Sequence, residues 1–562
     1  MKLLFGVHLH QPVDNFKEAI DEAVNKCYKP FFEVMKDYPE FKFSFHSSGW
    51  ILDYLKQNYP EIIENIKKCN IEFFTGGYYE PILSIIPYKS QKTQIKKLNK
   101  FLFDEFNTMP KGLWLTERVW DYSIIKAIKK NNIKYMIVDD THIFSSNKNN
   151  IEGYYWSEDE IALFPINKNL RYKLPFSKVE EAITEIKKYK TAIMFDDIEK
   201  FGLWPTTYEW VYNKNWLREF VEAVLNDEEI KTCHFEEYYK ENESLGLVYP
   251  ELVSYDEMNE WAGGNFKKFF LKYSESNRLH KRMLEFKHKD DENLYKLQTN
   301  DVFWHGVFGG IYLPSLRDNA YKYLLLLEDE KYIKLKDFLL QGYNQLKISN
   351  EKMIMIFSQK GGSLIEFSDK NKLFNYQNTL TRRKEKYHDE IISQSNDEVT
   401  TIHNQAYHFD KSKLIFDSYE KVSFIDHLNN ESYADKIYNL NNFTFSYKEI
   451  TKKIEILENG FSFKININKE NKNSYILEFN LHFAHYHNKF ILIEDNNIVL
   501  IDEWLKNNIK ISFNQQVNIK YEYIKTYSKA EKGVDSIIQG ISIKCEFEFN
   551  NILNLEGKIC LK

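Results

Sequence analysis

The sequence predicts an α/β fold in which a (β/α)7 barrel is followed by a helical layer and a C-terminal β-sandwich. Up to about residue 264, short apolar runs alternate with amphipathic segments, a pattern typical of parallel strands covered by helices. No GxGxxG turn accompanies these strands, which favours a closed barrel over an open nucleotide-binding sheet. Towards the C-terminus, nearly the whole chain reads as alternating strands between polar turns, as in a sandwich.

The predicted domains are residues 1–264 for the catalytic barrel, 265–352 for a helical domain packed on it and 353–562 for the sandwich. The predicted barrel strands are Leu3–His8, Phe41–Phe45, Ile71–Thr75, Gly112–Thr116, Tyr135–Val138, Thr191–Phe195 and Lys231–Phe235. The helical patterns between them are Asn15–Met35, Gly49–Lys67, Ser90–Phe106, Tyr122–Asn131, Lys178–Lys190 and Asn215–Leu225. The helical domain is predicted to contain Phe266–Tyr273, Ser276–His288, Asp318–Glu328 and Tyr332–Tyr343. The predicted sandwich strands are Leu414–Phe416, Val422–Ile425, Phe443–Tyr447, Phe461–Ile467, Ser474–Phe483, Phe490–Glu494, Val517–Tyr523 and Ile541–Phe549.

Composition limits the class of function. The chain has 562 residues, a net charge of −6 and 28% charged residues, which gives no electrostatic reason to expect nucleic acid as a partner. Its five cysteines are scattered without a CxxC pair, which argues against a disulfide framework and a structural zinc site. No window approaches the ~18 apolar residues of a membrane span, and the N-terminal apolar run is too short for a signal peptide. We therefore expect a cytoplasmic protein without nucleic-acid or membrane partners; formation of a homo-oligomer stays open.

Polar residues follow the predicted strands at the end where a barrel places its chemistry. The set comprises His8, His10, His46, Glu72, Glu117, Asp139, Asp140, His142, Asp196, Asp197 and Glu199. Each of them alone is as well explained by a helix cap or a solvated loop. The convergence of six strand ends predicts an active site at the barrel mouth.

Glu117 and Asp197 are the best candidate pair for glycoside hydrolysis, which commonly needs two carboxyl groups on either side of the anomeric carbon. Glu117 lies between Trp114 and Trp120, whose indoles suit stacking on a sugar ring. Arg118 beside it is expected to lower its pKa, as a nucleophile requires. The competing interpretation is a structural carboxylate paired with Arg118, and this stretch alone favours that interpretation.

Five stretches resemble glycoside hydrolase family 57, specifically its 4-α-glucanotransferase and α-amylase branch. They are His10–Pro12, Ile71–Leu83, Trp114–Trp120, Asp196–Gly202 and Met258–Trp261. Three further matches are Lys272–Met283, Trp304–Leu313 and Thr526–Gly533. The resemblance therefore covers nearly the whole chain, and its longer motifs are specific.

The resemblance implies the same three-part fold and a 4-α-glucanotransferase that acts on maltooligosaccharides, starch or glycogen through a glucosyl-enzyme intermediate. Glu117 stands at the position of the nucleophile and Asp197 at that of the acid/base, and a retaining pair is expected to lie about 5–5.5 Å apart. No cofactor and no metal ion is implied. With Trp114 and Trp120, the expected substrate-binding residues are His8, His10, Glu72, Asp196, Glu199, Trp204, Trp261 and Trp304.

The chain departs from the family pattern in two places. Phe195 and Ile198 stand where this branch usually has His and Gly, which bears on the geometry of the acid/base loop. The stretch from Trp261 to Lys272 is shorter than in relatives, and Phe266 stands where Trp is expected. The second departure bears on acceptor binding and therefore on transfer against hydrolysis.

Three other functions stay open. An α-amylase-type hydrolase would use the same two carboxyls and pass the glucosyl group to water. A metal-dependent hydrolase or deacetylase on a similar barrel would take its ligands from His8, His10, Asp139, Asp140 and His142. A non-catalytic glucan-binding protein is the third, and the presence of both carboxyls argues against it.

Overall fold

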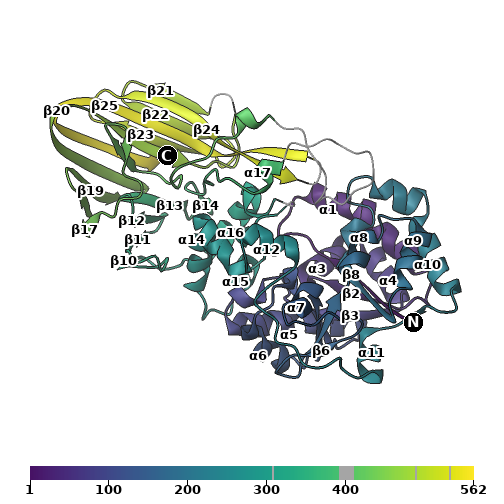
Figure 1. Ribbon diagram of the computed structural model, residues 1–562. Coiled ribbons are helices and arrows are strands. Elements are labelled where there is room, and N and C mark those ends of the chain that lie inside the picture. The colour runs from purple at the N-terminus through teal and green to yellow at the C-terminus, as the bar shows by residue number, and fades with distance from the viewer. Residues whose placement is uncertain (307–308, 391–409, 488–489, 531–532) are drawn as a thin grey trace.

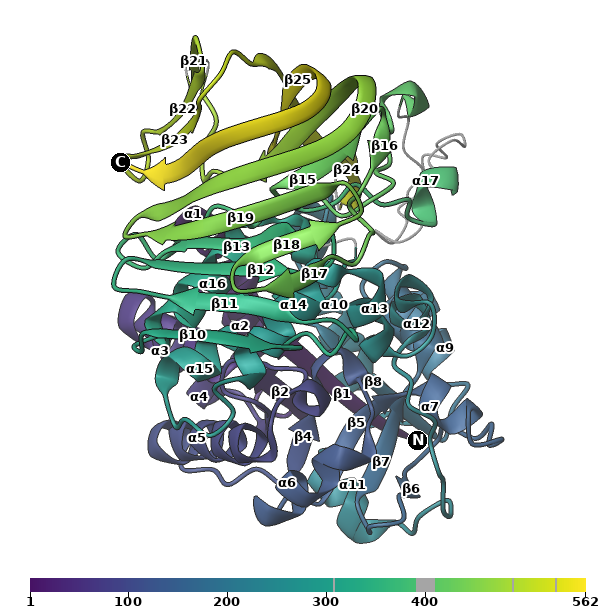
Figure 2. The ribbon, with the colours of Figure 1, turned by 90° about the vertical axis from the view of Figure 1, so that its left-hand side faces the viewer.

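The computed structural model describes residues 1–306, 309–390, 410–487, 490–530 and 533–562, so parts of the matched stretches Trp304–Leu313 and Thr526–Gly533 lie outside the described residues. A barrel lies at one end of the molecule and β-sheets at the other (Figure 1). In the turned view, helices α14 (Ser274–Leu284) and α16 (Pro314–Leu326) lie between the two (Figure 2). No helix in the described ranges is long and apolar enough to cross a membrane.

Within the described residues, seven parallel strands form the barrel. In spatial order they are β7 (Ala162–Ile166), β5 (Tyr135–Asp139), β4 (Gly112–Trp114), β3 (Ile71–Thr75), β2 (Phe43–Ser47), β1 (Lys2–Leu9) and β8 (Thr191–Asp197). The backbone N–H of Asn167, just after β7, donates to the carbonyl of Ile193 in β8 at 2.9 Å, so the two end strands meet. The predicted (β/α)7 barrel is confirmed.

One predicted barrel strand is wrong and one strand was missed. The missed seventh strand is β7, which the sequence hides because Pro165 within it argues against a central strand. The predicted strand Lys231–Phe235 is only the two-residue β9 (Lys231–Thr232), which lies beside the start of β1. Phe235 instead begins α11 (Phe235–Glu241) and packs against the side chains that fill the barrel, together with Phe74 and Phe195.

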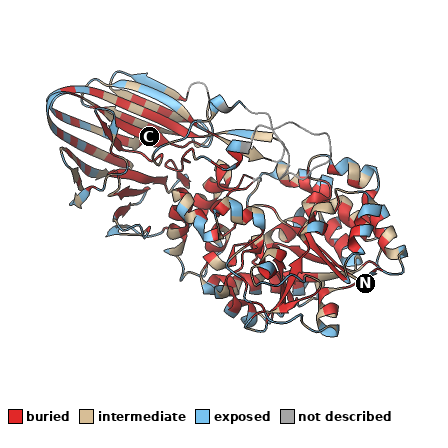
Figure 3. Cartoon of the chain, viewed as in Figure 1, coloured by how far each residue is buried: buried red, intermediate tan, exposed pale blue. Residues whose placement is uncertain are grey.

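The barrel strands are buried and wrapped by helices (Figure 3). These are α1 (Lys17–Ala23), α2 (Lys29–Met35), α3 (Gly49–Asn58), α4 (Pro60–Lys68), α5 (Tyr88–Phe106), α6 (Ile125–Lys130), α7 (Asp140–Phe144), α8 (Lys168–Lys173), α9 (Val179–Ile186) and α10 (Trp216–Asn226), and α12 (Asp256–Ala262) follows α11. In α4, proline stands at the first position and two lysines at the last turn, which suits the helix ends, while three isoleucines on one face are buried.

The helical layer is shorter than expected. It contains α13 (Phe269–Lys272), α14, α15 (Glu292–Leu297) and α16. The predicted helix over Tyr332–Tyr343 is wrong, because Tyr332–Lys336 is the strand β10. Its side chains alternate between apolar and charged with a period of two, which is the pattern of a strand.

The C-terminal part is a sandwich of two sheets that share one core. The smaller sheet runs β10, β11 (Gln345–Ser349), β12 (Met353–Ser358), β13 (Ser363–Asp369) and β14 (Phe374–Asn375). The larger comprises β15 (Ile425–Leu428), β16 (Glu431–Ser432), β17 (Asn439–Asn441), β18 (Thr444–Tyr447), β19 (Ile450–Leu457), β20 (Gly460–Leu481), β21 (Ile491–Glu494), β22 (Asn497–Asp502), β23 (Asn507–Phe513), β24 (Asn518–Ala530) and β25 (Gly533–Leu561). Phe357 of the smaller sheet meets Phe461 of the larger edge to face at 4.9 Å. The predicted sandwich is confirmed, but Leu414–Phe416 is not a strand.

Candidate active site

Neighbouring barrel strands place His8, His46 and Asp197 at one level of the barrel mouth. His8 in β1 pairs in register with His46 in β2 and with Asp197 in β8. Glu117 follows β4 at the same end of the parallel sheet. The two candidate catalytic carboxyls therefore meet at one mouth, close enough for the charge of Asp197 to act on Glu117.

Glu117 has a left-handed backbone. Its φ is 51° and its ψ 19°, and the φ of Arg118 is 49°; non-glycine residues in this region of φ and ψ cluster at functional sites. Two residues just before α12 support it, since Ser254 Oγ donates to the Glu117 carbonyl and Tyr255 OH donates to Glu117 Oε2 at 2.7 Å. These two hydrogen bonds fix the backbone and the carboxylate of Glu117.

Burial raises the pKa of Glu117 above its ordinary value, the Arg118 guanidinium opposes the rise, and the Asp197 carboxylate adds to it. Arg118 lowers the pKa of Glu117 as expected, but desolvation outweighs the guanidinium and the net shift is upward. Arg118 lies over the ring of Tyr255 at 4.3 Å and over that of Trp114 at 5.4 Å. Two carboxyls whose charges repel tend to share one proton, which is what an acid beside a nucleophile needs.

Asp197 is fixed through Asp196. Asp196 Oδ1 accepts from the backbone N–H of Asp197 at 2.9 Å, and Arg171 Nε donates to Asp196 Oδ2 at 3.0 Å. Lys200 Nζ donates to the same oxygen. Burial opposes the charge, but Lys200 and Arg171 hold the pKa of Asp196 far below its ordinary value. Because Asp196 is fully buried, it positions the candidate acid/base and does not face the mouth.

Phe195 and Ile198, the two departures beside the candidate acid/base, fit their places. Phe195 enters the barrel interior, where a Cβ on Gly6 would lie 2.3 Å from its ring, so the glycine makes room for it. Ile198 begins a one-turn 3₁₀ helix (Ile198–Lys200), a right-handed conformation that needs no glycine, and its side chain is buried in the core. Neither residue displaces the strand end that carries Asp197.

A row of histidine and carboxylate side chains in contact with one another crosses the barrel mouth. His8 Nε2 lies 2.9 Å from Glu80 Oε1, and His10 Nδ1 lies 2.9 Å from Glu80 Oε2. His10 Nε2 also lies 3.3 Å from Asp301. Burial opposes these charges, but Glu80 and Asp301 raise the pKa of His10 well above its ordinary value, while His8 and His10 hold that of Glu80 well below. His10 is therefore a cation at the mouth, with its two ring nitrogens directed at Glu80 and Asp301.

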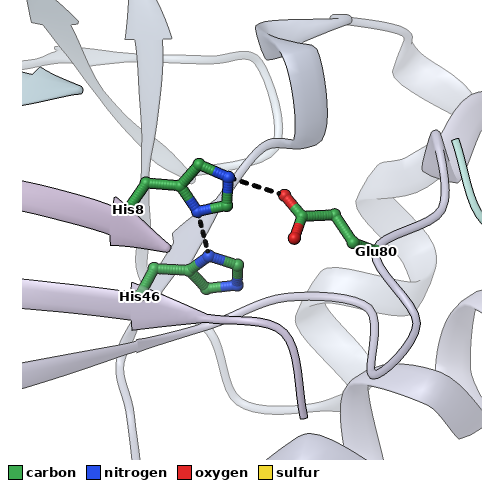
Figure 4. Close-up of side chains that lie close together, drawn as sticks. All are labelled: His8, His46 and Glu80. Atoms are coloured by element: carbon green, nitrogen blue, oxygen red, sulfur yellow. Dashed lines mark hydrogen bonds and ion pairs between the residues drawn. The ribbon is translucent and has the colours of Figure 1, made fainter. Parts of the chain in front are cut away.

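Among the described residues, His8, His46 and Glu80 could hold a metal ion. Their arrangement favours hydrogen bonds instead, because each ring nitrogen of His8 already has a partner. His8 Nε2 contacts Glu80, and His8 Nδ1 lies 2.8 Å from His46 Nδ1 (Figure 4). The ligands expected for a metal hydrolase are engaged elsewhere: Asp139 accepts from an arginine and His142 contacts a backbone carbonyl. In the part of the chain described, that constellation does not come together with His8.

Glu199 lies beside Asp197 at the same strand end. Its Oε1 accepts from Tyr28 OH at 2.6 Å and from the backbone N–H of His10 at 3.4 Å. Burial raises the pKa of Glu199 to about 7, and the charge of Asp197 contributes to the rise.

Trp204, Trp261 and Trp304, here called the tryptophan wall, line the same region. Trp261 and Trp304 lie nearly parallel, with ring centres 6.2 Å apart and 15° between planes. Trp204 stacks on Phe176 at 5.6 Å, and Tyr255 meets Trp261 edge-on at 6.3 Å. Flat indoles beside a few polar groups are typical of ligand sites that hold rings.

Besides Asp196, three of the expected sugar-binding residues lie outside the mouth or beneath it. Glu72 accepts from the backbone N–H of Phe235 at 2.6 Å, at the first turn of α11 and the opposite end of the barrel. Trp120 is buried in the core. Trp114 is also buried and stacks 4.3 Å from the ring of His8, so it forms the floor of the site.

Glu80, Tyr255 and Asp301 belong to the site although the sequence did not single them out. Glu80 takes the place expected for Glu72, and its signal was the glycine pair at 76–77, which marks where the chain leaves β3 for the mouth. Tyr255 and Asp301 come from segments far along the chain, and no local pattern marks them.

The barrel, the two carboxyls and the tryptophan wall define an enzyme of the glycoside hydrolase class. The sequence profile of glycosyl hydrolase family 57 matches residues 4–251. Profiles of the middle and C-terminal domains of alpha-amylase/4-alpha-glucanotransferase match residues 264–331, and 337–446 with 441–559. The chain belongs to glycosyl hydrolase family 57, as its motifs indicated.

Relatives of both activities cover the chain. It is 32% identical to an alpha-amylase of Pyrococcus furiosus, with 96% of each chain covered, and 32% identical to a 4-alpha-glucanotransferase of Thermococcus litoralis, with 98% of each covered. The crystal structure of the 4-alpha-glucanotransferase from Thermococcus litoralis matches with a TM-score of 0.90 at 30% identity, covering 100% of this chain and 99% of that one. The sequence alignment with the Thermococcus litoralis relative spans 654 positions, although this chain has only 562 residues. That relative therefore has segments that this chain lacks.

Proposed function

We propose that this enzyme is a retaining 4-α-glucanotransferase for α-1,4-glucans, with Glu117 as nucleophile and Asp197 as acid/base. The observation that carries the proposal is that both carboxyls follow strand ends at the same barrel mouth, Glu117 after β4 and Asp197 at the end of β8. Glu117 attacks the anomeric carbon while Asp197 protonates the leaving oxygen, and a glucosyl ester forms as the glycosidic bond breaks. The 4-hydroxyl of an acceptor, deprotonated by Asp197, then displaces Glu117 and restores the α linkage.

The surrounding residues support this role. His10, held as a cation between Glu80 and Asp301, places a positive charge at the mouth and orients these two carboxylates as acceptors for sugar hydroxyls. The tryptophan wall offers apolar faces for glucose rings and excludes water, which favours an acceptor sugar over hydrolysis. Hydrolysis of the α-amylase type is the second candidate, because relatives with either name are equally similar.

Incubation with maltotriose tests the proposal. A ladder of longer and shorter maltooligosaccharides is expected, and only shorter products would mean hydrolysis. Glu117→Gln is the control that must give neither. Activity that a chelator abolishes and zinc restores would replace the proposal with the metal-dependent alternative.

We also propose a cytoplasmic location. All five cysteines are free thiols, and three of them are buried, which suits a reducing compartment. Cells are lysed directly into denaturant with an alkylating reagent and without a reductant. The reagent is then expected to label all five cysteine thiols of this protein. Fewer labels would contradict this location.

A further inference from the structure

A loop in the β-rich part of the chain reaches back to the tryptophan wall. Glu385, just before α17 (Tyr387–Glu390), is buried and accepts three hydrogen bonds from the helical layer. The donors are Lys272 Nζ at 2.6 Å, Tyr273 OH at 2.7 Å and Tyr312 OH at 2.9 Å. A buried carboxylate stays ionised only with partners of this kind.

Lys272 connects this carboxylate to the wall. Its ammonium also donates to the carbonyl of Trp261 at 3.0 Å, near the C-terminal end of α12, where carbonyls lack helical partners. The backbone of Gly306 passes so close that a Cβ there would lie 2.6 Å from the Trp261 ring and 2.7 Å from that of Trp304. The spacing of the two indoles is therefore tight, and a shift of α12 would disturb it.

The same loop makes a second contact beside Trp304. The neighbouring His305 donates from Nδ1 to a backbone carbonyl four residues on, and its Nε2 accepts from Tyr387 OH at 2.8 Å. Burial lowers the pKa of His305 to about 4, so the ring is neutral as this pattern requires. The loop itself is fixed to β24, since His388 Nε2 donates to the carbonyl of Tyr527 at 2.8 Å.

We propose that Glu385 is a positioning residue that, through Lys272, holds the Trp261–Trp304 pair at the spacing that grips a glucan. The inference rests on the proposed function, because it assumes that these indoles contact the sugar. The sandwich then contributes to substrate binding and not only to stability.

Glu366 provides a matched control. It pairs a sandwich strand with the helical layer in the same way as Glu385, through Arg282 Nε at 2.9 Å, and it is equally buried. In the described part of the chain, its hydrogen bonds and ion pairs do not reach the tryptophan wall. Glu366→Gln therefore reports the purely structural cost of losing such a pair.

Steady-state kinetics with maltotriose test the inference. Glu385→Gln and Lys272→Met are each expected to raise KM about tenfold with kcat within about threefold, since misplacing a binding group weakens substrate positioning. Lys272→Arg should keep both hydrogen bonds and restore KM. Glu366→Gln is expected to lower the melting temperature without moving KM. A Glu385→Gln enzyme that behaves like Glu366→Gln would overturn the inference, and Lys272→Met decides it if Glu385→Gln does not fold.

A binding titration separates this inference from the proposed function. Maltooligosaccharide is titrated calorimetrically into Glu117→Gln and into the double variant Glu117→Gln/Glu385→Gln. About tenfold weaker binding by the double variant is expected. Equal binding by the two would remove the role of Glu385 alone, whereas no binding by Glu117→Gln would remove the proposed function as well.

Discussion

At the residue scale, Glu117 and Asp197 lie at the same barrel mouth but are supported by different neighbours. Tyr255 and Ser254 form hydrogen bonds with Glu117, and Asp196 accepts a hydrogen bond from the backbone N–H of Asp197. The proposed roles differ in their need for a proton, because only the acid/base has to protonate a leaving group. A donor whose leaving group needs no proton can therefore tell the two carboxyls apart.

Asp197→Asn is expected to lower kcat/KM on maltotriose by about 10²- to 10⁴-fold, which is the usual contribution of a general acid. Glu117→Gln should lose at least as much. With α-maltosyl fluoride, Asp197→Asn should regain a burst of fluoride release as the ester forms, whereas Glu117→Gln should release none. Stopped-flow detection of fluoride measures both. A burst from Glu117→Gln and none from Asp197→Asn would reverse the assignment.

Glu199 makes a prediction about pH. Its pKa is raised to about 7, first by burial and then by Asp197, so above about pH 7 Glu199 ionises and adds a negative charge beside the candidate acid/base. Glu199→Gln removes that charge. The alkaline limb of the kcat/KM profile should then move to lower pH by about one unit. An alkaline limb that stays in place would show that Glu199 does not act on the acid/base.

At the element scale, β3 and the loop after it carry two glutamates with opposite placements. Glu72 faces the start of α11, where it accepts from two backbone N–H groups, and Glu80 faces His8 and His10. The first therefore closes the bottom of the barrel and the second shapes its mouth. Substitutions at the two positions should separate stability from catalysis.

Glu72→Ala is expected to destabilise the protein by about 2–4 kcal/mol, because it leaves several buried donors without an acceptor. KM for maltotriose should not change at a temperature where the variant is folded. Glu80→Gln should raise KM or lower kcat with a smaller loss of stability. Urea unfolding and kinetics on both variants check this. A kinetic effect of Glu72→Ala alone would return Glu72 to the sugar site.

The elements also show what the sequence could predict. The strand Ile71–Thr75 appears with the predicted bounds, because an apolar run between polar segments is a local signal. β7 stayed hidden because Pro165 contradicts the strand propensity around it, although the strand pairs with β5 along its whole length. Glu117 and Asp197 follow strands that the same kind of local signal predicts, whereas Tyr255 reaches Glu117 across 138 positions of sequence and left no local trace.

At the scale of the whole molecule, buried ion pairs join the helical layer to the sandwich. Arg383 lies 2.7 Å from Glu275 of α14, and Arg282 of the same helix lies 2.9 Å from Glu366 of β13. Lys347 of β11 lies 2.6 Å from Glu328, which follows α16 and also pairs with Arg282. Such pairs tolerate the loss of one partner poorly, since the remaining charge is left buried. The interface between the two regions should therefore depend strongly on the ionisation of its glutamates.

Acid should weaken this interface over a defined range of pH. Burial opposes ionisation, but Arg383 lowers the pKa of Glu275 to about 2, and Arg282 with Lys347 lowers that of Glu328 to about 2. Both values lie below the unfolded value of about 4.5, so the unfolded chain binds more protons between about pH 4.5 and 2. The stabilisation, on the order of 3 kcal/mol for each group, is complete above that range and is lost as the pH falls through it.

The melting temperature of the wild type should therefore fall steeply as the pH drops below about 4.5. Glu275→Gln/Glu328→Gln should melt lower near neutral pH, and its melting temperature should fall less steeply between pH 4.5 and 2, because neither position titrates. Near-ultraviolet circular dichroism follows tertiary packing during the melts. Parallel pH curves for the two proteins would mean that other carboxylates control the acid response and that this interface is not its weak point.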